Sequence, residues 1–388
     1  MTTEFATRYG FDRADVGLAN WRQAPFSHWA FQNVAEVVPT AWRAAAVMKH
    51  EEPGADPAIL TQSFTVQGQR ASLADHLAAS ATDLFTIMRG GEFLADWSAP
   101  YADPARPHLV FSITKSLTAL VAGALEAQGL LSPEDPVTRF VPEAAQSAFG
   151  NATLRHLLDM TVQLQFDEAY LDPDSPFARY RRAMLWNPGN DGENLRQFLC
   201  TIPGQDCAHG GSFRYRSPVS DMLGVVVERA GGARLADLLD RLIWQKIGAQ
   251  GPLGLTVDAI GTPRAAGGGL LAARDLARVG EMMRQGGMAP GGRVLPEAWV
   301  RDTVENGDRG DWERGDFPEL LPGGAYRNQW YRAASGWFGA IGIHGQWLAV
   351  DPASETVLVK FSSQAEPVDD DQDQRNIALF EAIFQHFS

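Results

Sequence analysis

The chain has 388 residues, of which 45% are hydrophobic and 21% charged, as expected for a soluble globular protein with a sizeable core. Its formal net charge of −14 argues against nucleic acid or an anionic membrane as a partner. Two cysteines, Cys200 and Cys207, are too few for a disulfide framework, so we expect reduced thiols, with one local bridge as the alternative.

The N-terminus has no basic region followed by an apolar run, so the sequence predicts no secretory signal. No stretch approaches the roughly eighteen uninterrupted apolar residues that would indicate a membrane span. We therefore expect a cytoplasmic protein that does not bind a membrane.

Residues 1–80 are rich in tryptophan and proline and show no clear periodicity. We expect them to be irregular and to wrap around the main body. A hairpin follows, with strands over 84–88 and 92–97 joined by the turn 89–91, because apolar and β-branched residues flank two glycines there.

A central helix is predicted over 112–128. Apolar residues recur in it at steps of three and four, and Gly129 supplies the stop. A short capped helix is expected over 153–160, and residues 161–212 are expected to be rich in loops.

Further helices are predicted over 218–230, 234–247 and 272–285, and a terminal helix from about residue 374. Strands are predicted over 337–343, 346–350 and 356–361. Strands thus lie at both ends of the chain and helices fill its middle. The economical architecture is an α+β fold whose antiparallel sheet uses both ends of the chain, with helices flanking it and a helical insertion.

The first turn of the central helix carries Ser112 and Lys115, three residues apart on one face. The helix dipole there favours a developing negative charge on the serine oxygen. A desolvated amine could take the hydroxyl proton, which would make Ser112 a nucleophile. The alternative is an ordinary N-cap serine beside a solvated lysine. Only four of the chain's 33 basic residues are lysines, and a cation is unfavourable at this helix end, so we favour the catalytic interpretation.

A second candidate site is Tyr215-Arg216-Ser217, which directly precedes the predicted 218–230 helix. A tyrosine at this place can relay a proton if a nearby cation stabilises its phenolate. Alternatively, Tyr215 packs on the surface, and we expect Ser217 to cap the helix. Spacing alone does not choose between the two roles of Tyr215.

Other motifs are missing from the sequence. It has no zinc-binding H-E-x-x-H or C-x-x-C, no G-x-S-x-G elbow and no glycine-rich nucleotide loop, so we expect no metal and no cofactor. Asp369, Asp371 and Asp373 lack the rest of a calcium loop and are interpreted as a solvated acidic run. His344 is the one histidine that we place near the chemistry.

Six segments in a fixed order together resemble the serine β-lactamase and penicillin-binding family. Within it they resemble the 6-aminohexanoate-dimer hydrolases and related carboxylesterases. The segments are Phe111-Ser112-Ile113-Thr114-Lys115-Ser116, 157–160, 167–170, Tyr215-Arg216-Ser217, 273–280 and 341–346. The resemblance covers most of the chain from about Trp21 onward. It implies one β-lactamase-like domain over 1–388, with an α/β part (1–110 and 250–388) and a mainly helical part (111–249).

The resemblance also implies residue roles. Ser112 would be the nucleophile, Lys115 and Tyr215 would transfer protons, and the backbone amides of Ser112 and Ile343 would hold the oxyanion. The candidates for substrate binding are Tyr170, Arg181, Trp186, Ser217, Ala266, Tyr331 and His344.

Two departures from the family pattern bear on the substrate. Ala340-Ile341-Gly342 stands where β-lactamases carry Lys-Thr-Gly, so no cation is present there for a β-lactam carboxylate. The segment 172–186 carries Arg179, Arg181 and Arg182, which would favour neutral or anionic substrate ends over ammonium unless they simply pair with Asp172 or Asp174.

We therefore expect a monomeric or homodimeric serine hydrolase that cleaves small linear amides or carboxylic esters through an acyl-Ser112 intermediate. The alternatives are a β-lactamase or DD-peptidase-like enzyme, and a non-catalytic binding protein with the same fold.

Overall fold

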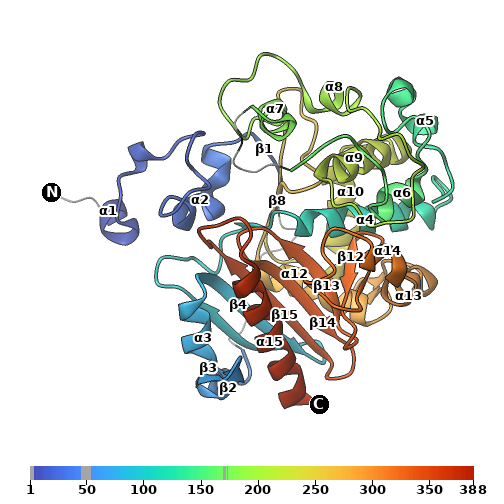
Figure 1. The fold of residues 1–388 in the computed structure, drawn as a ribbon. Helices are drawn as coiled ribbons and strands as arrows, with labels where there is room; N and C mark the ends of the chain where they lie inside the picture. Colours follow the sequence, from blue (N-terminus) through green and yellow to red (C-terminus); the bar gives the residue numbers. More distant parts are fainter. Residues whose placement is uncertain (1–3, 45–53, 169–171, 173) are drawn as a thin grey trace.

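The computed structural model describes residues 4–44, 54–168, 172 and 174–388 (Figure 1). Its strands are β1 (Thr40–Arg43), β2 (Ser63–Val66), β3 (Gln69–Ser72), β4 (Thr82–Arg89), β5 (Glu92–Ser98), β6 (His108–Leu109), β7 (Leu253–Thr256), β8 (Gly269–Leu271), β9 (Met288–Ala289), β10 (Gly292–Arg293), β11 (Ala325–Arg327), β12 (Trp330–Arg332), β13 (Phe338–Gly342), β14 (Gln346–Asp351) and β15 (Thr356–Ser362). Its helices are α1 (Glu4–Tyr9), α2 (Ser27–Asn33), α3 (Leu73–Ala79), α4 (Ile113–Glu126), α5 (Val137–Phe140), α6 (Leu154–Leu158), α7 (Pro176–Ala183), α8 (Leu195–Leu199), α9 (Ser217–Gly231), α10 (Leu235–Leu239), α11 (Gln245–Ile247), α12 (Ala273–Arg284), α13 (Glu297–Glu305), α14 (Arg309–Glu313) and α15 (Asp370–Phe387).

The main sheet has seven strands in the order β11-β12-β13-β14-β15-β4-β5, and all neighbouring strands in it are antiparallel. The hairpin β4–β5 comes from the N-terminal part of the chain and pairs through β4 with β15 near the C-terminus. The predicted α+β fold, with an antiparallel sheet built from both ends of the chain, is therefore confirmed.

Helices cover both faces of this sheet. Successive side chains of a strand point to opposite faces, and β14 shows this directly. Leu348 lies against the backbone of Gly280 in α12, whereas the ring of Trp347 is 5.6 Å from the ring of Phe380 in α15. The strands β14 and β15 are consequently buried along their whole length.

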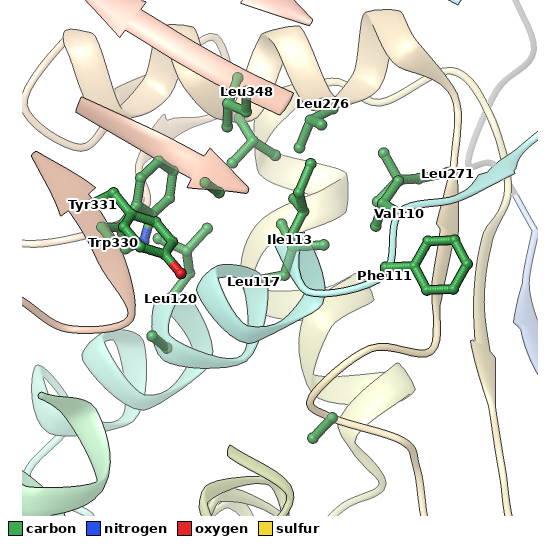
Figure 2. Packing of buried hydrophobic residues seen from close by; sticks show 14 of the residues in the cluster. Val110, Phe111, Ile113, Leu117, Leu120, Leu271, Leu276, Trp330, Tyr331 and Leu348 are labelled. Carbon is green, nitrogen blue, oxygen red and sulfur yellow. The ribbon is translucent and has the colours of Figure 1, made fainter. Parts of the chain in front are cut away.

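The helical part of the chain packs around α4, which contacts α9 and α10 (Figure 1). Figure 2 shows Ile113, Leu117 and Leu120 of α4 in one apolar cluster with Leu276 of α12 and Leu348 of β14. The helix is buried on every side from Ile113 to Leu125, and not only on the face that the periodicity indicated. α4 thus links the helices to the main sheet.

A smaller sheet leads the chain into α4. Its strands run in the order β1-β7-β8-β6, and β6 ends three residues before Ser112. The amide of Val110 donates to the carbonyl of Gly269 over 2.9 Å, which extends the pairing with β8. The start of α4 is therefore held by backbone hydrogen bonds on its N-terminal side.

The structure corrects several predictions. Residues 1–80 are not irregular, since they contain α1, α2, β1, the hairpin β2–β3 and α3. The helix predicted over 234–247 is present over 235–247, but its middle, residues 240–244, is a π-helical turn between α10 and α11. The terminal helix begins at residue 370, because the Asp369 carboxylate accepts the amide of Gln372 and caps it. Asp373 is partly buried, so the acidic run is not fully solvated.

In the part of the chain that the structure describes, no helix combines the length and the apolar character needed to cross a bilayer. Both cysteines are free thiols.

Candidate active site

Ser112 stands at the N-cap position of α4, but its side chain does not cap the helix. Its backbone is already helical, with φ −66° and ψ −11°, and its hydroxyl accepts no amide of the first turn. The preceding residue, Phe111, has a φ of +42°, which is unfavourable for a bulky side chain. This sharp turn from β6 into α4 leaves the Ser112 hydroxyl for other partners.

Lys115 forms a hydrogen bond with that hydroxyl. Its Nζ donates to Ser112 Oγ over 2.8 Å and to the carbonyl of Ala266 over 2.7 Å. It also lies 4.7 Å from the centroid of the Tyr215 ring. The side chain of Lys115 is buried, with its residue 1% exposed, so the alternative of a solvated first-turn lysine is wrong.

Burial lowers the pKa of Lys115 from 10.5 to about 7. Glu168 and Asp221 oppose that change, and the guanidinium of Arg264 adds to it. A desolvated ammonium is expensive, so the neutral amine is populated near neutral pH. An amine in this state, 2.8 Å from a serine oxygen, can accept the hydroxyl proton.

A buried charged pair holds the carbonyl that Lys115 contacts. The Asp221 carboxylate accepts the amide of Ala266 over 2.8 Å. The same carboxylate forms an ion pair with Arg264 and a hydrogen bond with the hydroxyl of Tyr180. The side chains of Asp221 and Arg264 are 0% and 6% exposed, so the pair is strongly desolvated and rigidly packed.

Tyr215 reaches the site from the segment before α9. Its hydroxyl is within hydrogen-bonding reach of the side chains of Ser112 and Tyr331. Burial, and then the charge of Glu168, raise the pKa of the Tyr215 phenol well above its usual value. The phenol is therefore neutral and can donate or pass on a proton, and a standing phenolate is disfavoured. Because its side chain is buried beside Ser112, the alternative that Tyr215 packs on the surface is wrong.

Two carboxylates hold the backbone around Tyr215. Asp316 accepts the amide of Tyr215 over 2.9 Å and pairs with Arg216 over 2.7 Å. Glu168 accepts the amide of Ser217. The expectation that Ser217 caps the helix is wrong, because Ser217 is the first residue of α9 and Arg216 is at the N-cap.

The end of β13 lies directly against the backbone of Ser112. A Cβ atom on Gly342 would stand 2.7 Å from the carbonyl oxygen of Val110 and 3.1 Å from the amide nitrogen of Ser112. Only glycine permits this approach without a shift of the backbone. The close approach brings Ile343, the next residue, beside Ser112. The backbone amides of Ser112 and Ile343 could there hold a developing oxyanion.

Two cavities meet at Ile343. The smaller has a volume of about 20 Å³, and its walls include Ser112, Arg22 and Arg181. The larger has a volume of about 430 Å³, and its walls include Tyr215 and Tyr331. Ser112 thus lines one cavity and Tyr215 the other, and Ile343 lines both.

The structure brings most of the predicted substrate-binding residues to these cavities. Arg181, Trp186, Ser217 and Ala266 line the smaller one, and Tyr331 lines the larger one. Tyr170 lies outside the described residues.

His344 lines neither of these two cavities. Its ring packs against Phe31 and Phe111, and its Nδ1 bonds to the carbonyl of Gln364 over 2.7 Å. Burial lowers the pKa of His344 to about 4, so the ring is neutral. The structure therefore makes His344 a packing partner of the residue that precedes Ser112.

Of the arginines on the 172–186 segment, only Arg181 lines the smaller cavity. Arg179 pairs with Glu193 on the surface, with Nε and Oε2 2.8 Å apart, and not with Asp172 or Asp174 as the alternative proposed.

Sequence reasoning missed Asp221, Arg264 and Arg22. A signal for Asp221 was present, because it is a lone carboxylate within the apolar run of α9 and a buried charge needs a partner. Arg264 and Arg22 carry no comparable local signal, since their neighbours in space lie far away in the chain.

Comparison with known proteins places this geometry in a family. The family model described as Beta-lactamase matches residues 70–382. A 6-aminohexanoate-dimer hydrolase of Paenarthrobacter ureafaciens is 35% identical over 371 residues, which cover 94% of this chain and 93% of the relative. Esterase EstB of Burkholderia gladioli is 33% identical over 182 residues, covering 42% of this chain and 44% of the relative.

Among solved structures, a protein from Bacillus anthracis described as a 6-aminohexanoate-dimer hydrolase superposes with a TM-score of 0.86 at 24% identity, and the match covers 97% of this chain and 98% of that one. This likeness supports the fold. The chain belongs to the β-lactamase family and is a serine hydrolase.

Proposed function

We propose that the protein hydrolyses small linear amides or carboxylic esters through an acyl-Ser112 intermediate. The observation that carries this proposal is the contact of 2.8 Å between Lys115 Nζ and Ser112 Oγ, made by an amine whose pKa burial lowers to about 7. The hydrolase and esterase activities named for its relatives support the substrate class.

The first half of the reaction follows from the positions of the three side chains. Neutral Lys115 takes the hydroxyl proton of Ser112 as Oγ attacks the substrate carbonyl. The amides of Ser112 and Ile343 stabilise the negative charge on the tetrahedral oxygen. Tyr215 then gives its proton to the leaving nitrogen or oxygen and is reprotonated by the ammonium of Lys115. The bond to the leaving group breaks, and an ester of Ser112 remains.

The second half uses the same groups with water as the nucleophile. Lys115, neutral again, accepts a proton from water, directly or relayed through the Tyr215 hydroxyl, as the water oxygen attacks the acyl carbon. Collapse of the second tetrahedral intermediate returns that proton to Ser112 Oγ and releases the carboxylic acid. No group other than those of the chain, the substrate and water enters these steps.

A β-lactam substrate has less support. The strand position occupied by Ala340, Ile341 and Gly342 offers no cation to a β-lactam carboxylate. The wall of the larger cavity also includes the carboxylate of Asp370, which would repel it, whereas the charge of Asp316 there is matched by Arg216.

A substrate panel tests the proposed function. We expect turnover of p-nitrophenyl esters or of short aminohexanoate amides, and little or no turnover of nitrocefin. Turnover of nitrocefin alone would assign the protein to the β-lactamases. Failure to hydrolyse any of the three would contradict the proposal.

We further propose a cytoplasmic monomer or homodimer with small molecules as its partners. The two unpaired cysteines support a reducing compartment. The division into an α/β part (1–110 and 250–388) and a helical part (111–249) also stays a prediction. Gel filtration with light scattering would test the oligomeric state.

A further inference from the structure

The smaller cavity beside Ser112 is lined by three arginines, Arg22, Arg181 and Arg264. The charge of Arg264 is matched by the buried carboxylate of Asp221. Arg22 is different. Its Nη1 donates to the carbonyl of Trp186 over 2.8 Å, and its Nη2 donates to the side-chain oxygen of Asn187 over 2.5 Å. Both acceptors are neutral.

Within residues 4–44, 54–168, 172 and 174–388, Arg22 forms no ion pair with a carboxylate. Its guanidinium carbon lies 4.7 Å from the ring centroid of Trp21, so aromatic surface covers part of the group. Burial, and then the positive charge of Arg181, hold the pKa of Arg22 well below its usual value. Such a cation is destabilising unless an anion joins it.

Arg22 and Arg181 both line the smaller cavity. Both also contribute to the lowered pKa of the buried ring of His344, which leaves that ring neutral and unable to add a third charge. Arg181 stacks on Phe177, with its guanidinium carbon 4.4 Å from the ring centroid, and both of these residues line the cavity. An anion placed in the cavity would therefore meet two guanidinium groups and apolar walls.

The position of Tyr215 decides which part of a substrate enters this cavity. Under the proposed function Tyr215 protonates the leaving group, and Tyr215 lines the larger cavity of about 430 Å³. The acyl part then points the other way, into the cavity of about 20 Å³ on the Ser112 side. That volume holds about one water-sized group, so the cavity takes only the tip of an acyl group, such as an oxygen of a terminal carboxylate, and the rest of the acyl chain stays at its mouth.

We propose that Arg22 and Arg181 form an anion subsite that binds a free carboxylate at the far end of the substrate's acyl group. Preferred substrates are then monoesters or monoamides of short dicarboxylic acids. The inference rests on the proposed function and adds the chemical class of the acyl group to it. A guanidinium presents paired N–H donors that match a carboxylate, so the subsite selects for shape as well as for charge.

The test compares two esters that differ only at the acyl end, monoethyl glutarate and its isosteric neutral amide, ethyl 4-carbamoylbutanoate. The wild type is expected to have a kcat/KM about tenfold to a hundredfold higher for the carboxylate. Arg22→Gln and Arg181→Gln should each reduce this ratio severalfold, and Arg22→Lys should retain part of it. Arg179→Gln is the matched control, because Arg179 pairs with Glu193 on the surface and its substitution should leave the ratio unchanged.

Two outcomes overturn the inference while leaving a hydrolase. The first is hydrolysis of both esters with no preference for the carboxylate, and the second is a preference that survives both glutamine substitutions. Melting temperatures of the variants separate a lost fold from a lost subsite, and Arg181→Gln does not touch the hydrogen bonds of Arg22 to Trp186 and Asn187. If neither ester is hydrolysed and Ser112 is not labelled by a fluorophosphonate, the proposed function fails together with the inference.

Discussion

Replacing Lys115 with methionine should abolish activity and yet stabilise the fold at low pH. The folded state lowers the pKa of this amine from 10.5 to about 7, and each pKa unit corresponds to about 1.4 kcal/mol. Charging Lys115 therefore destabilises the folded state by about 5 kcal/mol well below pH 7. Methionine has a similar length and no charge, so it removes this penalty.

The sign follows from linkage. A group whose pKa is depressed on folding contributes stability above its unfolded pKa and loses it as the pH falls through its folded pKa. For Lys115 the relevant window runs from pH 10.5 down to about 7. At pH 9.5 the penalty is about a third of its value at pH 6, so the advantage of methionine should shrink by about 3 kcal/mol between pH 6 and pH 9.5.

A constant cost acts against the gain. Methionine leaves the carbonyl of Ala266 and the hydroxyl of Ser112 without the donor that now lies 2.7 and 2.8 Å away. An unpaired buried acceptor costs about 1–3 kcal/mol, and this cost does not vary with pH in the window. Only the Ala266 carbonyl is fully buried, since Ser112 is half-buried, so the cost applies once and the net gain at pH 6 is about 2–4 kcal/mol. The dependence of the gain on pH is unaffected.

Urea unfolding of the wild type and the variant at pH 6 and pH 9.5 measures both quantities. Lys115→Arg is the matched control, because arginine stays charged over the whole range and should gain nothing at pH 6. A difference between wild type and Lys115→Met that is the same at both pH values would refute a depressed pKa at Lys115. It would also remove the basis for a lysine base.

Three further predictions concern the same site. The kcat/KM for a neutral ester should rise with pH through an apparent pKa of about 7 and then level off, because Lys115 accepts a proton only when it is neutral; a profile that is flat from pH 5 to 9 would contradict this. Tyr215→Phe keeps the ring beside Lys115 but lacks the hydroxyl, so kcat should fall by about 10²–10⁴-fold, and a kcat within tenfold of the wild type would rule out proton transfer by Tyr215. Asp221→Asn should lower the free energy of unfolding in urea by about 3–5 kcal/mol, because it leaves the charge of Arg264 buried and unpaired. Glu193→Gln, which breaks the surface pair with Arg179, should lower it by less than about 1 kcal/mol. Equal effects of the two substitutions would show that the buried pair contributes no more to stability than the surface pair.

The predictable part of the fold was the part with strong periodicity. The strands β13 to β15 and the helices α4, α9 and α12 appear where the sequence indicated them, because each buries an apolar set at regular spacing. The N-terminal elements were missed, since β1, β2 and β3 have only four residues each and carry too few repeats to be recognised. The pairing of β1 with β7 joins segments far apart in the chain, which no local pattern reveals.

Some residues of the candidate site could likewise be predicted from local spacing, and others could not. Ser112 and Lys115 could be paired because three residues on a helix bring them to one face. The sequence placed His344 near the chemistry through its neighbour Ile343, but its backbone has a φ of +61° and its ring packs under Phe111. Arg22 could not be anticipated, because only the folded chain brings it to the cavity that Arg181 lines.

The oxygen of Ser112 should form the covalent intermediate. Intact-mass spectrometry after treatment with a fluorophosphonate tests it most directly, with Ser112→Ala as the comparison and circular dichroism to verify that the variant is folded. We expect one added label on the wild type and none on Ser112→Ala. Labelling of Ser112→Ala at the rate of the wild type would place the nucleophile elsewhere and contradict the account.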